Sequence, residues 1–347
     1  MAPYSPPSAG REGKLRLDFN ENTVGCSPQV LAFLKRKLTE EQLTIYPEYE
    51  ATRQALSGYF QVPEDQFLIT NGTDEAIQVL INTYVDNHDD VLILHPSYAM
   101  YRFYSEVAGA DVRELSYRKE DLAFPVRGLI SRIRPKTRAI LISNPNNPTG
   151  TAIGIGDIVH ILEAAPNAAV LIDEAYYEFY GVTALRLIDK YPNLYVSRTF
   201  SKAFGMAALR VGCLFSQAGN VKIMRKAQSP YSVNMLAALA VRAAVEDRTY
   251  VDAYVRDALA ARELLYQGFT KRDIRYYSSH ANFVLFEAGK RAIPVRDALR
   301  ARGILVRDRS YELPGTVRVT AGTPAQAAQF FKALDEVWSV VRTEVKK

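Results

Sequence analysis

The middle of the chain alternates short apolar runs, rich in β-branched residues, with longer stretches of helical periodicity. The apolar runs cover residues 90–94, 139–143, 169–173, 194–197 and 211–215. This alternation is typical of a mainly parallel sheet covered by helices, so the sequence predicts an α/β fold. Because ligands of open α/β sheets bind beyond the carboxyl ends of the strands, the residues that follow these runs are the first candidates for chemistry.

The character of the sequence changes at about residue 252. A charged amphipathic helix predicted over 252–269 precedes strand-like runs at 282–286, 303–307 and 317–320, which indicates a smaller α+β domain. The helix predicted over 28–38 has no sheet partner nearby, so we expect its segment to join that domain. The predicted parts are a mobile N-terminal arm (1–13), an N-terminal segment joining the small domain (14–38), a large domain (39–251) and a small C-terminal domain (252–347).

Composition narrows the class of protein. With 347 residues, 48% of them hydrophobic, the chain can bury a full core. No run approaches the roughly eighteen apolar residues of a membrane span, and no signal peptide is evident, so we expect a cytoplasmic protein without a membrane partner. The two cysteines lie far apart, which favours neither a disulfide nor a metal site. The net charge is +5, and the basic residues are interspersed with acidic ones instead of forming a block. This favours small anionic ligands over nucleic acid.

Two residues at strand ends suggest Schiff-base chemistry. Lys202 lies in RTFSKAFG, directly after the run 194–197, and Asp173 closes the run 169–173. A lysine that forms a Schiff base needs an electron sink beside it, and a pyridine ring serves as one while a buried carboxylate keeps its nitrogen protonated. Each residue also has an ordinary explanation, since Lys202 could be a surface lysine and Asp173 could cap the next helix.

Two further motifs follow strands. NPNNPTG (144–150) contains two prolines and a glycine, which fix a rigid turn that can hold Asn147 against a ligand oxygen. NGTDE (71–75) precedes a helix predicted over 75–85, where free backbone N–H groups can bind phosphate and Gly72 permits close approach. An ordinary Thr or Asp N-cap explains the second motif equally well.

Together these motifs resemble the fold-type I, aspartate-aminotransferase-like enzymes, and most closely the histidinol-phosphate aminotransferase family. The resemblance runs from about residue 17 to residue 337. It rests on ten segments in family order: DFNEN, YPEY, NGTDEAI, HPSYAMY, SNPNNPTG, VLIDEAYYEF, SRTFSKAFGMAALRVG, ANFVLF, GILVRD and VRVTAGTP. It implies that the large domain binds pyridoxal 5'-phosphate.

The resemblance also implies roles for residues around the cofactor ring. Lys202 carries the cofactor as a Schiff base and moves a proton during the reaction, while Asp173 holds the pyridinium nitrogen. Asn147 and Tyr176 hydrogen-bond the phenolic oxygen, and Tyr98 stacks on the ring.

The cofactor phosphate has its own expected set of residues. The resemblance assigns it to the backbone N–H groups of Thr73 and Asp74 and to the side chains of Thr199, Ser201 and Arg210. Tyr46 matches a tyrosine that reaches this phosphate from a neighbouring subunit, so the resemblance implies a homodimer with shared active sites.

On the substrate side, Arg318 matches the arginine that binds the α-carboxylate, and Arg307 matches a position that meets a distal phosphate. A planar guanidinium suits such bidentate pairing. Asn22 is expected near the substrate, in a segment reading NENT where the family usually has NENP. Residues 25–28 read GCSP instead of the usual GPSP, and Ile45 stands where an arginine is common. These departures bear on the choice of substrate rather than on the cofactor.

The expected reaction is a ping-pong transamination of histidinol phosphate with 2-oxoglutarate, giving imidazole acetol phosphate and glutamate in histidine biosynthesis. An aromatic or other amino-acid aminotransferase stays open, because it would keep Arg318 and use another side-chain pocket. A threonine-phosphate decarboxylase-like lyase also stays open, since sequence does not show which Cα bond is held perpendicular to the ring. A non-catalytic, cofactor-sensing regulator is disfavoured because no DNA-binding domain precedes residue 17.

Overall fold

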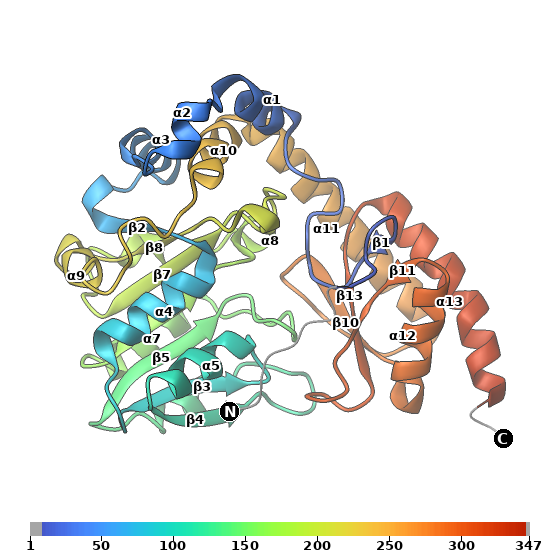
Figure 1. Cartoon of the computed structure of the whole chain (residues 1–347). Helices are drawn as coiled ribbons and strands as arrows, with labels where there is room; N and C mark the ends of the chain where they lie inside the picture. Colours follow the sequence, from blue (N-terminus) through green and yellow to red (C-terminus); the bar gives the residue numbers. More distant parts are fainter. Residues whose placement is uncertain (1–8, 345–347) are drawn as a thin grey trace.

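The computed structural model describes residues 9–344. The chain forms two lobes, which Figure 1 shows side by side. The large lobe contains a seven-stranded sheet, and the small lobe contains a four-stranded and a two-stranded sheet. Within residues 9–344, no helix is long and apolar enough to cross a membrane.

The large sheet has the strand order β2-β8-β7-β6-β5-β3-β4. Its strands are β2 (Phe67–Thr70), β3 (Asp90–His95), β4 (Asp111–Ser116), β5 (Thr137–Ser143), β6 (Ala169–Asp173), β7 (Leu194–Thr199) and β8 (Gly212–Phe215). Only β8 runs antiparallel to its neighbours in this sheet, and the other pairs are parallel. All five predicted apolar runs form strands of this sheet, so the α/β prediction is confirmed.

Both faces of this sheet are covered, which explains why its central strands are continuously apolar. Alternate residues of β5 and β6 enter different clusters: Leu141 and Leu171 face one set of helices, and Ile142 and Ile172 face the other. The first face packs under α4 (Gly72–Tyr84), α5 (Ala99–Val107) and α9 (Ala218–Met224). The second packs under α3 (Glu50–Phe60), α7 (Ile155–Ala164) and α10 (Met235–Glu246). The buried strands therefore form a firm base for the loops at their carboxyl ends.

The small lobe has a core of its own, centred on Phe269, Phe286 and Phe330. Its antiparallel sheet has the order β12 (Arg307–Asp308), β13 (Thr316–Thr320), β10 (Phe283–Glu287) and β9 (Tyr276–Tyr277). Helices α12 (Ala292–Ala301) and α13 (Pro324–Glu344) pack on it. The long helix α11 (Arg248–Lys271) links the lobes, because Tyr254 belongs to the large core and Leu265 to the small one.

Short elements complete the described chain. The helices are α1 (Pro28–Lys37), α2 (Glu40–Thr44), α6 (Val126–Ile130) and α8 (Tyr177–Tyr180), and the 3₁₀ turns cover Glu64–Gln66, Leu185–Leu187, Ala207–Leu209 and Gly289–Arg291. The run predicted over 303–307 divides into β11 (Ile304–Leu305) and β12, which lie in different sheets. Helix α4 begins at Gly72, three residues before the predicted start, so its first turn includes the NGTDE motif.

The N-terminal segment departs from expectation in two ways. Residues 14–38 do not join the small lobe as a unit: β1 (Leu15–Arg16) pairs with β11, but α1 packs against α10 with Val30 in the large core, because α10 offers that helix an apolar face. Residues 9–13 are held in place, because Arg11 pairs with Asp18 at 2.8 Å and Arg300 donates to the Ala9 carbonyl at 2.9 Å. Residues 1–8 of the expected arm lie outside the described residues.

Candidate active site

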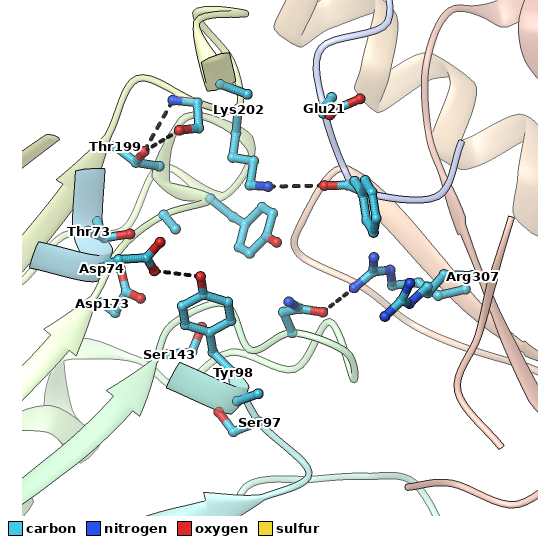
Figure 2. A pocket seen from close by; sticks show the side chains of 18 of the residues that line it. Glu21, Thr73, Asp74, Ser97, Tyr98, Ser143, Asp173, Thr199, Lys202 and Arg307 are labelled. Carbon is cyan, nitrogen blue, oxygen red and sulfur yellow. Dashed lines mark hydrogen bonds between the residues drawn. The ribbon is translucent and has the colours of Figure 1, made fainter. Parts of the chain in front are cut away.

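A cavity of about 640 Å³ lies between the two lobes. Twelve of the fourteen predicted site residues line it: Thr73, Asp74, Tyr98, Asn147, Asp173, Tyr176, Thr199, Ser201, Lys202, Arg210, Arg307 and Arg318. Figure 2 shows Thr73, Asp74, Asp173 and Lys202 on the side of the large sheet, with Arg307 opposite them. The carboxyl ends of β5, β6 and β7 meet at this edge, as expected for an open α/β sheet.

Lys202 lies in a tight turn that follows β7. Phe200 and Phe204 anchor the turn in the large core, and the Thr199 hydroxyl accepts a hydrogen bond from the Ser201 N–H at 3.1 Å. The Lys202 side chain points into the cavity, where Nζ donates to the Phe19 carbonyl at 3.1 Å. Burial, followed by the charge of Arg318, lowers the pKa of Lys202 to about 8. A larger share of this amine is therefore neutral, and nucleophilic, at physiological pH than for an ordinary lysine.

Asp173 ends β6 and is only 2% exposed. Its two carboxylate oxygens accept hydrogen bonds from the hydroxyls of Tyr101 and Ser197, both at 2.8 Å. Both partners are neutral, and burial raises the pKa of Asp173 to about 6. A cation beside this carboxylate would stabilise its ionised form, because an opposite charge favours ionisation where water is excluded.

The three asparagines of the NPNNPTG turn have different roles. Asn144 exchanges hydrogen bonds with the backbone of Ile153, and Asn146 donates to the Pro96 carbonyl and the Thr149 hydroxyl. These two side chains hold the turn from inside. Asn147 is left to face the cavity, where its carboxamide oxygen accepts a hydrogen bond from Arg318.

The first turn of α4 lies beside Arg210 and Tyr98. The Asp74 carboxylate accepts hydrogen bonds from the Tyr98 hydroxyl at 2.6 Å and from Arg210 at 3.0 Å. Gly72 has a φ of +73°, and an added Cβ would lie 2.6 Å from Nη2 of Arg210, so a glycine suits this position. No side chain caps the first turn of α4. Its backbone N–H groups and Arg210 together make a site suited to an anion such as phosphate.

The side of the cavity formed by the small lobe carries three arginines. Arg307 lies on β12, Arg318 lies beside it on β13, and Arg309 follows β12. The Arg307 guanidinium stacks over the Phe19 ring, 5.3 Å from its centroid. Burial, and next the charge of Arg309, lower the pKa of Arg318 to about 10, which still leaves it positively charged at neutral pH.

The whole site lies within a region that matches a known family. The model of the aminotransferase class I and II family matches residues 12–334. This chain belongs to that family. The aminotransferase is 36% identical to the histidinol-phosphate aminotransferase of Symbiobacterium thermophilum, over 96% of this chain and 95% of that protein. The resemblance inferred from the motifs is therefore confirmed.

Two solved structures are similar to the aminotransferase in fold. The histidinol-phosphate aminotransferase of Clostridium acetobutylicum superposes with a TM-score of 0.84 at 25% identity, over 93% of this chain and 98% of that one. The enzyme of Sinorhizobium meliloti, solved with pyridoxal-5'-phosphate, has a TM-score of 0.86 at 22% identity, over 94% and 91%. The fold prediction is confirmed.

Enzymes of this family use pyridoxal 5'-phosphate, and the residues of this cavity fit that cofactor. The buried carboxylate of Asp173 has only neutral partners in the described part of the chain, so a protonated ring nitrogen would satisfy it. Lys202 offers an amine with a lowered pKa, and Arg210 lies at the start of α4, where the phosphate is expected. The charges required at the two ends of the cofactor are therefore both present.

Two predicted residues do not line this cavity. Asn22 is 4% exposed, and its side chain donates to the Ala203 carbonyl and accepts from Val24 and Gly25, so its expected substrate role stays a prediction. Tyr46 is 74% exposed and stacks on Tyr231 at 4.4 Å.

Sequence reasoning missed seven polar or aromatic residues that line the cavity. They are Phe19, Glu21, Ser97, Ser143, Arg309, Tyr311 and Glu312. The signal for Glu21 was present in the DFNEN segment, where the prediction took the neighbouring Asn22 instead. Arg309, Tyr311 and Glu312 lie in an irregular turn after β12, where no periodicity indicates which side chains face inward.

Proposed function

We propose that this aminotransferase moves the amino group of histidinol phosphate to 2-oxoglutarate, with Lys202 as the residue that attaches the cofactor. The observation that carries the proposal is that Lys202 and Asp173 line one side of the cavity and a cationic wall lines the other. This wall consists of Arg307, Arg309 and Arg318. Lys202 and Asp173 suit cofactor chemistry. The cationic wall suits substrates that carry an anionic group remote from the amine or keto group.

The residues of the large lobe have separable tasks. When bound, pyridoxal phosphate supplies a carbonyl that captures amino groups and a ring that withdraws electrons from the substrate Cα. Lys202 Nζ would be the base that takes the proton from the substrate Cα and holds it for return to the reacting atoms. Asp173 would keep the ring nitrogen protonated, and Asn147 and Tyr176 would orient the ring through its phenolic oxygen.

The remaining large-lobe residues position the cofactor. Tyr98 would stack on its ring, and the Asp74 carboxylate holds the Tyr98 hydroxyl in place through a hydrogen bond of 2.6 Å. The backbone N–H groups of Thr73 and Asp74 hold the phosphate, together with the side chains of Thr199, Ser201 and Arg210.

The small lobe selects the substrates. Arg318 binds the α-carboxylate of the keto acid acceptor, and Arg307 binds the distal phosphate of the donor. Arg318 is held in place because it donates to Asn147 and, at 2.6 Å, to the Asp18 carbonyl. Relatives named as histidinol-phosphate aminotransferases, 31–36% identical over most of this chain, support this choice of donor.

We also propose that the enzyme is a homodimer that works in the cytoplasm in histidine biosynthesis. Tyr46 does not line the cavity of its own chain, so it can serve the cofactor phosphate of a partner subunit. Tyr231 stacks on Tyr46, and further exposed apolar side chains lie on α1 (Leu31), at α2 (Leu43 and Ile45) and on α10 (Leu236), which suits a protein interface.

A panel of amino donors with 2-oxoglutarate, scored by glutamate formation, tests the proposed reaction. We expect histidinol phosphate to give a higher kcat/KM than phenylalanine, tyrosine or aspartate. A higher value for an aromatic donor would replace the proposal with an aromatic aminotransferase. Release of CO₂ from O-phosphothreonine without glutamate formation would replace it with a decarboxylase.

A further inference from the structure

Arg309 is the least expected charge in the cavity. It lies beyond β12, faces the same space as Arg307 and Arg318, and is only 8% exposed. Its position is fixed through the backbone, because its N–H donates to the Thr316 carbonyl at 3.0 Å and its own carbonyl accepts from Glu312 and Leu313. The guanidinium is therefore presented to the cavity by a rigid turn.

The Arg309 guanidinium has one acidic partner, Glu312, three residues further along the same turn. Glu312 also lines the cavity, and burial raises the pKa of its carboxyl, against the effect of the Arg309 charge. The Nε atoms of Arg309 and Arg318 have no hydrogen-bond partner among the described residues. These two Nε atoms are buried away from the cavity space, so the N–H groups that can meet an acceptor there are those at the ends of the two guanidinium groups, whose residues line the cavity.

The charges of the wall do not balance. Arg307, Arg309 and Arg318 contribute three cations, and Glu312 is the acid that pairs directly with one of them. Arg318 already donates to Asn147 and to a backbone carbonyl, which suits the α-carboxylate role proposed above. Among the described residues, the Arg309 guanidinium hydrogen-bonds Glu312 and lies over the Tyr311 ring, so an incoming anion can take the place of that carboxylate.

We propose that Arg309 binds the distal anionic group of the substrates, and that Glu312 is an internal competitor that occupies Arg309 when no such group is bound. This inference rests on the proposed function and extends it. Arg309 joins Arg307 in binding the donor phosphate, and it also binds the distal carboxylate of the acceptor. The competition weakens anion binding and thereby helps an anionic product to leave. Arg309 and Glu312 should then have opposite effects on affinity.

Titration of the cofactor-loaded enzyme with small anions tests this directly, with the cofactor absorbance as the readout. The probes are glutarate, which has a distal carboxylate, inorganic phosphate, which represents the phosphate ester, and propionate, which has no distal anion. Loading with cofactor keeps inorganic phosphate out of the cofactor's phosphate site. We expect Arg309→Gln to weaken glutarate and phosphate roughly ten- to a hundredfold, as for the loss of one charged hydrogen bond, with propionate within about twofold of wild type.

Glu312→Gln should act in the reverse direction. It removes the competing charge, so glutarate and phosphate should bind about three- to tenfold more tightly, with propionate unchanged. Arg309→Lys keeps a cation without the planar fork and should recover part of the affinity that Arg309→Gln loses. Arg302→Gln, on an exposed ion pair with Glu336, is the matched control and should behave like wild type.

Equal weakening of all three probes by Arg309→Gln would overturn the proposal, because it would show a structural role for the arginine. Weaker or unchanged anion binding in Glu312→Gln would also overturn it, and this variant decides the matter if Arg309→Gln does not fold. A wild-type enzyme that fails to use histidinol phosphate removes the proposed donor, but the glutarate titrations still test Arg309 against the acceptor.

Discussion

The two walls of the cavity, one formed by the large lobe and one by the small lobe, differ in the balance of the charged groups that line them. On the large-lobe wall, Asp173 accepts two hydrogen bonds and Asp74 joins Tyr98 to Arg210. On the small-lobe wall, the three arginines Arg307, Arg309 and Arg318 line the cavity together with one carboxylate, that of Glu312. The difference indicates that the first wall is organised in advance around a resident cofactor, whereas the second is completed by groups that arrive with each substrate.

The walls also differ in the secondary structure that holds their side chains in place. Asp173 ends, and Lys202 follows, a strand that is buried on both faces, whereas Arg307 and Arg309 lie on a two-residue strand and the turn after it. Hydrogen bonds connect the sides, among them those from Arg318 to Asn147 and from Lys202 to the Phe19 carbonyl. Substitutions on the large-lobe wall should therefore affect all substrates alike, and those on the other wall should depend on the substrate.

Replacement of Lys202 should have the largest effect of all. Lys202→Ala removes both the attachment of the cofactor and the base that moves the Cα proton, so we expect kcat to fall by about 10⁴-fold for every donor. Steady-state assays with histidinol phosphate and with an aromatic donor measure this. Lys222→Ala, on the exposed side of α9, is the matched control. A fall in kcat for one donor but not the other would contradict the proposal that the large-lobe wall acts on all substrates alike.

Asp173→Asn should have the next largest effect. The variant keeps the shape of the side chain but loses the charge that keeps the ring nitrogen protonated, so we expect kcat to fall about 10²- to 10³-fold for all donors. The cofactor should still bind, which its absorbance will show. Turnover near the wild-type value would mean that another group protonates the ring.

Arg307→Ala should separate the two walls most clearly. Loss of a charged contact in a desolvated site costs about 2 kcal/mol or more, so we expect kcat/KM for histidinol phosphate to fall at least about thirtyfold. An aromatic donor, which lacks the distal anion, should stay within about threefold of wild type. Competition assays with both donors measure the ratio, and an equal loss for both would remove the phosphate role of Arg307.

The smallest expected effect is a pH dependence on the large-lobe wall. The neutral amine of Lys202 is the nucleophile, so its reactive fraction grows as pH rises through its pKa of about 8. The rate at which cofactor-free enzyme takes up pyridoxal phosphate should therefore rise about tenfold between pH 7 and pH 9 and then level off. A rate that continues to rise to pH 10 would show that Lys202 titrates like an exposed lysine.

The sequence predicts the large-lobe wall better than the other, and the reason is physical. Strands buried on both faces must be apolar throughout, so β5, β6 and β7 stand out as runs, and the residues that end them are fixed in space. The turn residues Asn144, Asn146 and Asn147 look alike in sequence, yet the resemblance was sufficient to choose the one that faces the cavity.

The small-lobe wall was only partly predictable. Arg307 and Arg318 were found through family motifs, but Arg309 and Glu312 lie in a turn whose side-chain directions follow from backbone hydrogen bonds and not from any repeat. Asn22 does not line the cavity for a related reason. Its amide closes the local turn with Val24 and Gly25, and that contact decides its direction.

Borohydride reduction of the cofactor-loaded enzyme, followed by peptide mapping, tests the central claim most directly. Reduction fixes the bond between the cofactor and the lysine that attaches it. We expect the pyridoxyl group on the peptide that contains Lys202, because Lys202 is the lysine that lines the cavity beside Asp173. A pyridoxyl group on any other lysine would contradict the assignment of the large-lobe wall as the cofactor site.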